Sequence, residues 1–173
     1  MIRFAQKKDL KEIAEIHLHN RKVAYQGIMN ECYLNGLTQE SVYEQWIIYY
    51  RKADRKILVY DLDGKVVGFA GVKFFEGKMN CGLLDYFHTK EGYRNRGIGS
   101  ALWTAACSLL LSEGIQNMEI FCVEGNDSAK KYYKKRQLLK KLSGLQQIVK
   151  QENLLPDSSL TRRHTSLTRR VIS

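Results

Sequence analysis

Apolar and polar residues follow two different periods along the chain, and each stretch of constant period predicts one element. Apolar residues recur every three to four positions in four segments, which indicates amphipathic helices. These segments begin near Asp9, Thr38, Ile98 and Asp127. Runs rich in β-branched and aromatic residues predict strands at 2–5, 56–60, 66–75, 81–89 and 118–123. The Asp63–Gly64 pair between the second and third runs predicts a tight turn, and therefore a hairpin.

Composition places the chain among ordinary globular proteins. It has 173 residues, of which 44% are apolar and 27% charged, so we expect a single domain with a sizeable core. The chain has no run of 18 apolar residues, so it predicts no membrane span, and no apolar segment near its start, so it predicts no signal peptide. We therefore expect a cytoplasmic protein with no membrane partner. The four cysteines form no C-x-x-C pair and are expected as small core residues, with no metal site.

The formal charge of +10 is confined to one end of the chain. Residues 1–129 hold 16 basic and 16 acidic side chains, whereas residues 130–173 hold 12 basic and 2 acidic ones. A neutral body with a basic tail disfavours nucleic acid as the main partner. Apolar residues from Leu138 to Val149 keep helical spacing. After Pro156, the Ser/Thr/Arg-rich sequence predicts disorder or a late-docking strand within 165–172.

The strongest candidate for chemistry is a glycine-rich loop placed between a predicted strand and a predicted helix. It reads Arg94-x-x-Gly97-x-Gly99. Small residues allow close approach of a ligand to the backbone, and the N–H groups at a helix start favour phosphate or pyrophosphate. The competing interpretation is a tight turn with solvated arginines. The loop is neither a Walker A sequence nor a dinucleotide fingerprint.

The order of elements gives this loop a context. The predicted order is a strand, two helices, a hairpin, a long strand, the R-x-x-G-x-G loop, a helix and a strand. The sequence Asn126-x-x-Ala129-x-x-Tyr132-Tyr133 follows the last strand. From residue 2 to about 136 this resembles bacterial members of the GNAT superfamily of acetyl-CoA-dependent N-acetyltransferases. The resemblance implies an α/β (α+β) fold, with a mixed, mostly antiparallel sheet flanked by helices on both sides. It divides the chain into an acetyltransferase domain, 1–141, and an atypical basic segment, 142–173.

The resemblance also implies a function and a donor site. The expected reaction is acetyl transfer from acetyl-CoA, the co-substrate, to a primary amine by direct attack in a ternary complex. The amine belongs to a small molecule or a peptide, whose identity the sequence leaves open. The resemblance implies that the pyrophosphate is held by the backbone of Arg96, Gly97, Ile98, Gly99 and Ser100, with Arg94 beside it. It places Phe87, Thr89 and Asn126 along the pantetheine arm. Tyr133 would be the acid that protonates the departing thiolate.

The group that removes the amine's proton is less defined. Strand alternation puts Asp85 on the face of Phe87 and Thr89, which makes it our candidate base. The alternatives are a structural carboxylate paired with lysine at that position, Glu124 as the base, or a water relay with no single base. His88 is expected on the opposite face, packed into the protein.

The loop between the first two predicted helices is the candidate acceptor site. Aromatic side chains of Tyr25 and Tyr33 would pack the carbon chain of the amine, and Glu31 would attract its charge. An ordinary surface loop is the competing interpretation. We expect His17 and His19, two apart on a helix, to diverge and bind no metal.

The tail departs from the family pattern. Where the family has a Gly-Phe or Gly-Tyr pair opening a sixth strand, this chain has Gln137 and Leu138. A variant ending, a basic arm for RNA or an acidic partner, and a segment translated out of frame are three explanations. Loss of the last strands would expose a sheet edge and favour a homodimer. The alternative functions are a non-catalytic coenzyme A-binding module and a basic-tailed nucleic-acid- or ribosome-associated protein.

Overall fold

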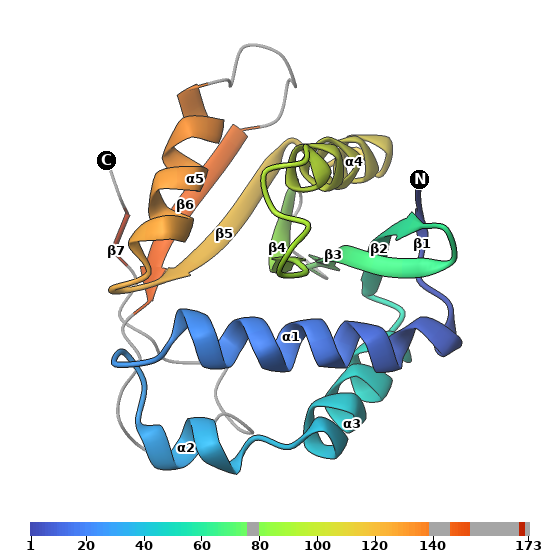
Figure 1. The fold of residues 1–173 in the computed structure, drawn as a ribbon. Coiled ribbons are helices and arrows are strands. Elements are labelled where there is room, and N and C mark those ends of the chain that lie inside the picture. The colour runs from blue at the N-terminus through green and yellow to red at the C-terminus, as the bar shows by residue number, and fades with distance from the viewer. Residues whose placement is uncertain (76–79, 139–145, 153–169, 172–173) are drawn as a thin grey trace.

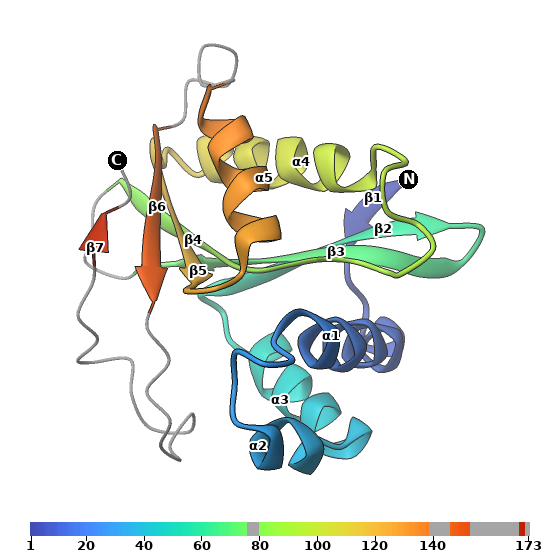
Figure 2. The ribbon, with the colours of Figure 1, turned by 60° about the vertical axis from the view of Figure 1, so that its left-hand side comes forward.

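The fold is a single sheet with helices against both of its faces, as Figures 1 and 2 show. The computed structural model describes residues 1–75, 80–138, 146–152 and 170–171. Within them the strands form one seven-stranded sheet whose spatial order follows the chain. The strands are β1 (Ile2–Phe4), β2 (Arg55–Leu62), β3 (Lys65–Phe74), β4 (Cys81–Thr89), β5 (Asn117–Val123), β6 (Gln146–Glu152) and β7 (Arg170–Val171). The expected mixed α/β architecture is confirmed.

The sheet contains both antiparallel and parallel strand pairs. The first four strands form an antiparallel meander, β5 runs parallel to β4, and β6 runs parallel to β5. The two residues of β7 pair antiparallel with β6. Four of the six strand pairs are therefore antiparallel, which matches the predicted mixed sheet.

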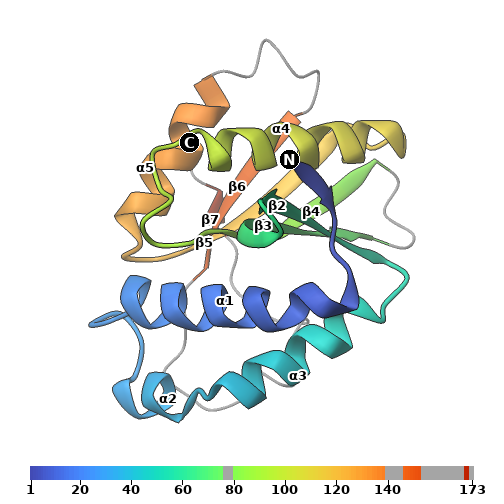
Figure 3. The same ribbon diagram turned by 45° about the vertical axis from the view of Figure 1, so that its right-hand side comes forward.

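The helices divide between the two faces. They are α1 (Leu10–Ala24), α2 (Glu31–Gly36), α3 (Gln39–Tyr50), α4 (Ile98–Ser112) and α5 (Asp127–Leu138), with a 3-10 turn, η1 (Lys7–Asp9), before α1. In Figure 3, α4 and α5 lie on one side of the sheet, and α1 and α3 on the other. Thr38 caps α3 by accepting a hydrogen bond from the Ser41 N–H at 3.1 Å, which confirms the predicted helix start.

Each helical layer has its own core. The α4 side packs the apolar stripe of α4, including Leu102, Ala106 and Leu110, onto β3, β4 and β5. The α1 side packs Leu10 and Ile13 with α3 and β3. Of the cysteines predicted as core residues, Cys107 and Cys122 are buried, Cys81 is partly buried and Cys32 is exposed. The core expectation therefore fails for Cys32.

The tail differs from its helical prediction. Residues Gln146–Glu152 form β6, which pairs with all seven residues of β5. The spacing from Leu138 to Val149 predicted a helix, but Ile148 and Val149 are β-branched, and pairing satisfies the backbone groups along the edge of β5. That edge is therefore not open to a second copy of the chain. Residues 139–145 and most of the basic arm lie outside the described residues.

A short helix replaces part of the predicted acceptor loop. In α2, the side chain of Asn30 accepts hydrogen bonds from the N–H groups of Cys32 at 2.8 Å and Tyr33 at 3.3 Å. Six residues are too few for a clear 3.6-residue period, so the pattern alone did not reveal this helix. The cap fixes the positions of Glu31 and Tyr33.

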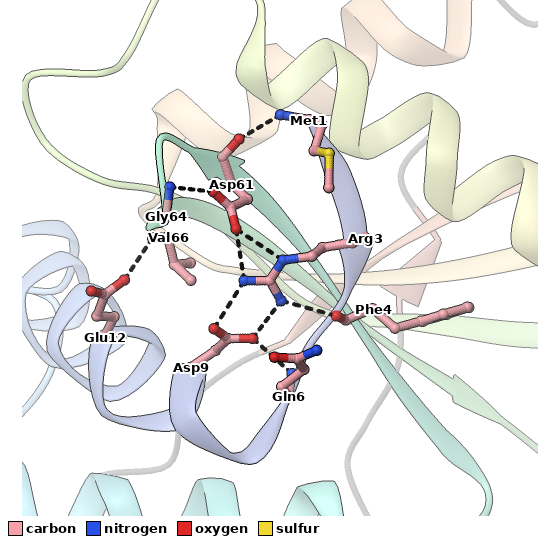
Figure 4. Close-up of polar contacts among 9 residues, drawn as sticks. All are labelled: Met1, Arg3, Phe4, Gln6, Asp9, Glu12, Asp61, Gly64 and Val66. Carbon is pink, nitrogen blue, oxygen red and sulfur yellow. Dashed lines mark hydrogen bonds and ion pairs between the residues drawn. The ribbon is translucent and has the colours of Figure 1, made fainter.

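Arg3 links β1 to the hairpin and to the start of α1 (Figure 4). Its guanidinium donates to both carboxylate oxygens of Asp9, at 2.6 and 3.0 Å, and to Asp61 at 2.9 Å. Asp9 also accepts from the Gln6 N–H at 2.7 Å, and Asp61 from the Gly64 N–H at 2.8 Å. The charge of the buried Asp9 is therefore compensated on two sides.

This network predicts a stability effect that depends on pH. Burial raises the pKa of Asp9, but hydrogen bonds from Arg3 and Gln6 outweigh it and hold that pKa below its ordinary value of 3.8. The carboxylate therefore stabilises the fold above about pH 4, and the contribution disappears as the pH falls further. We expect Asp9→Asn to lower the free energy of unfolding by about 2 kcal/mol at pH 7, measured by urea denaturation.

The control is Asp63→Asn, in the exposed hairpin turn, which we expect to change stability little. The difference between wild type and Asp9→Asn should shrink as the pH is lowered from 5 toward 3. A difference that stays constant over that range would contradict the ionic origin of the stabilisation.

Candidate functional site

The candidate site lies where β4 and β5 separate. These strands pair from Cys81 with Asn117 to Leu84 with Ile120, and beyond that β4 pairs only with β3 and β5 only with β6. A cavity of about 830 Å³ occupies the space between them, bounded also by α1, the glycine-rich loop and the start of α5. The predicted site residues that line it are Phe87, Thr89, Arg94, Gly97, Gly99, Ser100, Asn126 and Tyr133.

The glycine-rich loop presents the beginning of α4 to this cavity. Gly97 is the N-cap and has φ of +79°, a left-handed conformation that glycine adopts without strain. The first hydrogen bond of the helix runs from the Ala101 N–H to the Gly97 carbonyl at 3.0 Å, so the preceding N–H groups have no helical acceptor. A Cβ added at Gly97 would meet no protein atom within 4 Å. The loop therefore fits an anionic group lying against the helix start.

Two predicted members of the loop lie outside the cavity lining. The Ile98 side chain is 4% exposed and belongs to the core under α4, which leaves only its backbone for a ligand. The Arg96 side chain is exposed and absent from the lining, although its guanidinium lies 5.3 Å from the centre of the ring of Tyr93, which lines the cavity. The cation inside the site is therefore Arg94.

Asn20 is a site residue that the sequence reasoning missed. It is 5% exposed, on α1, and donates from Nδ2 to the Thr89 carbonyl at 2.9 Å. Its Oδ1 accepts from the Arg94 guanidinium, also at 2.9 Å. The available signal was a polar residue that continues the buried stripe of α1 three positions after His17. Asn20 thus joins α1, the end of β4 and the glycine-rich loop.

The start of α5 forms the opposite wall. Asn126 accepts a hydrogen bond from the Ala129 N–H at 3.1 Å, so its Oδ1 caps the helix and its Nδ2 remains to donate. Tyr133 is 8% exposed, and burial raises its pKa, so the phenol keeps its proton at neutral pH. Its ring lies 5.9 Å from that of Tyr132 and 6.1 Å from that of Trp103. This aromatic packing holds the α5 wall on α4.

A second contact joins α5 to the start of α4 beside the cavity. The Arg136 guanidinium, on α5, lies 5.2 Å from the centre of the Tyr132 ring and donates to the hydroxyl of Ser100 on α4. A Cβ at Gly99 would lie 3.4 Å from the Tyr132 hydroxyl. The sequence analysis gave no role to Arg136, because its partner lies 36 residues away.

Asp85 does not line the cavity. The register between β3 and β4 shifts at this point: Tyr86 pairs with Gly71 and Leu84 with Val72, so Asp85 is the extra residue of a β-bulge. The strict alternation behind its predicted face is therefore interrupted. Burial raises the pKa of this carboxyl, against the charges of Arg55 and Lys73.

His88 packs against α1, as expected. Its ring centre is 5.2 Å from that of His17 and 5.1 Å from that of Phe69, and part of it also lines the cavity. Burial, with the charges of Arg21 and Arg94, lowers the pKa of His88 to about 4. His17 accepts at Nδ1 from the Trp46 indole at 3.1 Å.

The remaining predicted groups are distributed around the cavity. Tyr25 is near enough to Tyr133 to affect its pKa, whereas Glu31 and Glu124 are exposed and outside the lining. His19 pairs with Glu91 at 2.6 Å, away from His17. No group of three or more His, Cys, Asp or Glu side chains within the described ranges could hold a metal. None of the helices described there is long and apolar enough to cross a membrane.

Comparison with known proteins agrees with this geometry. The model of the Acetyltransferase (GNAT) family matches residues 23–137, which include every residue of the cavity lining except Asn20. An uncharacterized N-acetyltransferase, YuaI, of Bacillus subtilis is 29% identical over 129 residues, 73% of each chain.

Solved structures show the same fold. PaiA N-acetyltransferase from Thermoplasma acidophilum, in complex with coenzyme A, superposes with a TM-score of 0.67 at 22% identity, over 79% of this chain and 87% of that one. A ribosomal-protein-alanine N-acetyltransferase from Brucella melitensis gives 0.61 at 16% identity, over 79% and 90%. Because the family model matches two thirds of its length, the chain belongs to the GNAT acetyltransferase family and is an N-acetyltransferase.

Proposed function

We propose that this protein transfers the acetyl group of acetyl-CoA to a primary amine by direct attack, with donor and acceptor bound together. The observation that carries the proposal is that one cavity is lined by the start of α4, the unpaired end of β4 and Tyr133. In the reaction the amine nitrogen forms a bond to the thioester carbon, the carbon–sulfur bond breaks, and the thiolate takes a proton. The cavity offers a place for each of these events.

The donor half would be bound mainly by backbone groups. The N–H groups from Gly97 to Ser100 would hold the pyrophosphate, where the helix dipole also favours negative charge. The pantetheine arm would run along the end of β4, where no strand pairs on the β5 side. The Thr89 carbonyl already accepts from Asn20 with one lone pair, so its second lone pair and the Asn126 Nδ2 are the polar groups available to the arm.

Proton transfer needs an acid and a base. Tyr133 is our proposed acid, because it is buried, neutral and in the cavity wall. We retain Asp85 as the proposed base, reached through water because it lies outside the lining. Glu124, exposed just before the α5 wall, and a water relay with no single base are the other arrangements compatible with this geometry.

Direct attack is favoured over an acyl-cysteine intermediate. Cys107 and Cys122 are buried, and burial raises the pKa of Cys107 to about 11 and raises that of Cys122 as well. Neither thiol would be a thiolate at neutral pH, and the thiolate is the nucleophilic form. No cysteine is among the residues that line the cavity.

The first prediction concerns donor binding. Gly97→Ala places a methyl group in the open space before α4 and strains a positive φ, so we expect at least a tenfold weaker affinity for acetyl-CoA, measured by calorimetry. Gly64→Ala is the matched control, because Gly64 also has a positive φ, +81°, and no atom within 4 Å, but lies in the β2–β3 turn. Equal losses in both variants, or no saturable binding by wild type, would refute the donor site.

The second prediction concerns Tyr133. Removing its hydroxyl in Tyr133→Phe should lower kcat roughly 10²-fold, the usual contribution of a general acid, and leave the affinity for acetyl-CoA within twofold. The measurement is steady-state release of free thiol with the best amine from a screen. Tyr43→Phe is the control, because Tyr43 is also a partly buried tyrosine but lies on α3, outside the cavity lining. A kcat for Tyr133→Phe equal to that of wild type would exclude the acid role.

A further inference from the structure

Arg21 is a cation on α1 whose guanidinium has an unfilled hydrogen-bonding position. Its Nε is buried and has no acceptor among the residues that the structure describes. Its guanidinium carbon lies 5.5 Å from the centre of the Tyr33 ring, at the start of α2. Buried donors without partners are rare in folded proteins, and each one calls for an explanation. Because this Nε has no accessible surface, a ligand could reach Arg21 only at the Nη end of the guanidinium.

The position of Arg21 is at the acceptor end of the proposed active site. Its charge acts on His17, His88 and Tyr86, so the guanidinium faces β4 from beneath α1. His88 lines the cavity, and so do two residues of α1 close to Arg21 in sequence, Asn20 and Val23. Arg21 is therefore next to the donor cavity but separate from the glycine-rich loop.

The charge around this position is not balanced by the described side chains. His88 is influenced by Arg21 and Arg94, and His17 by Arg21; no carboxylate acts on either ring. Asp85 is the carboxylate that acts on Tyr86, and its own cationic partners are Arg55 and Lys73. Arg21 itself forms no ion pair with a carboxylate among the described residues.

We infer that Arg21 binds a carboxylate of the acceptor, so the substrate is an amine that also carries a carboxylate, such as a free amino acid or a short peptide. This inference rests on the proposed function and narrows its acceptor class. The two Nη groups form the end of a planar guanidinium, and that end matches a carboxylate with two parallel hydrogen bonds. The Tyr33 ring below the plane fixes the orientation of that end.

The same arrangement disfavours polycationic acceptors. A polyamine or an aminoglycoside would bring further positive charges beside Arg21 and Arg94, in a partly desolvated space where like charges repel strongly. The substrate named for a structural neighbour, such as an aminoglycoside, is therefore not the one that this chain's own charges favour. The primary amine of the acceptor would extend from the guanidinium toward the donor cavity.

The experiment compares matched acceptors and matched variants. Free L-amino acids and dipeptides are assayed beside their C-terminal carboxamides, spermidine and kanamycin, by acetyl-CoA-dependent thiol release with the full chain. We expect the carboxylates to have a kcat/KM roughly 10- to 100-fold above that of their carboxamides, as two charge-assisted hydrogen bonds would give. Arg21→Gln should abolish this difference, Arg21→Lys should retain part of it, and the affinity of both for acetyl-CoA should stay unchanged. Lys22→Gln, which removes the adjacent cation, should behave as wild type.

The outcomes separate the two proposals. Three results would overturn the role of Arg21 and leave the donor site intact. The first is a preference for a carboxamide, spermidine or kanamycin, and the second is a carboxylate preference that persists in Arg21→Gln. The third is saturable acetyl-CoA binding without turnover of any carboxylate. Absence of acetyl-CoA binding by wild type would instead overturn the proposed function.

Discussion

The separation of β4 from β5 after four paired residues is the constraint on which the site depends. Strand pairing satisfies backbone polar groups, so a strand that loses its neighbour needs other partners along the freed edge. On β4 this edge runs from Asp85 to Thr89, and its last three residues, Phe87 to Thr89, form one wall of the cavity. The bulge at Asp85 marks the start of the separation on the β3 side of the strand. An extended ligand with amide groups would replace the missing strand.

The freed edge also explains the connection through Asn20. One side chain satisfies the Thr89 carbonyl at the end of β4 and at the same time orients the Arg94 guanidinium of the loop. Because Asn20 is buried on α1, the loop, the strand end and the helix are held in one arrangement by two hydrogen bonds. On the opposite wall, the contact between Arg136 and Ser100 links α5 to α4 in a similar way. The cavity is thus built by contacts between elements distant in sequence.

A feature of the fold or the site could be predicted from the sequence where it depends on interactions between residues that are close along the chain. The helices, the hairpin and the loop depend on local period, caps and turn residues, and residues such as Thr38 and Gly97 act as the sequence indicated. The β6 strand was not predictable from its spacing, because the edge of β5 decides its conformation. The face of Asp85 depends on a bulge that alternation cannot reveal. Asn20 and Arg136 act through partners 69 to 74 and 36 residues away, and a local pattern contains no sign of such contacts.

The two halves of the site differ in what carries their chemistry. In the proposed function, donor binding would use main-chain groups at the start of α4, so glycine positions encode it and the loop sequence is sufficient to suggest it. Acceptor binding would use side chains of α1, α2 and β4, among them Arg21, Tyr33 and Tyr86, which come together only in the fold. Asn20 and Arg21 are adjacent on α1 and point about 100° apart, as successive helical residues do. One residue therefore supports the donor half and the next faces the acceptor half, so acceptor preference can change at Arg21 while the hydrogen bonds that shape the donor cavity remain.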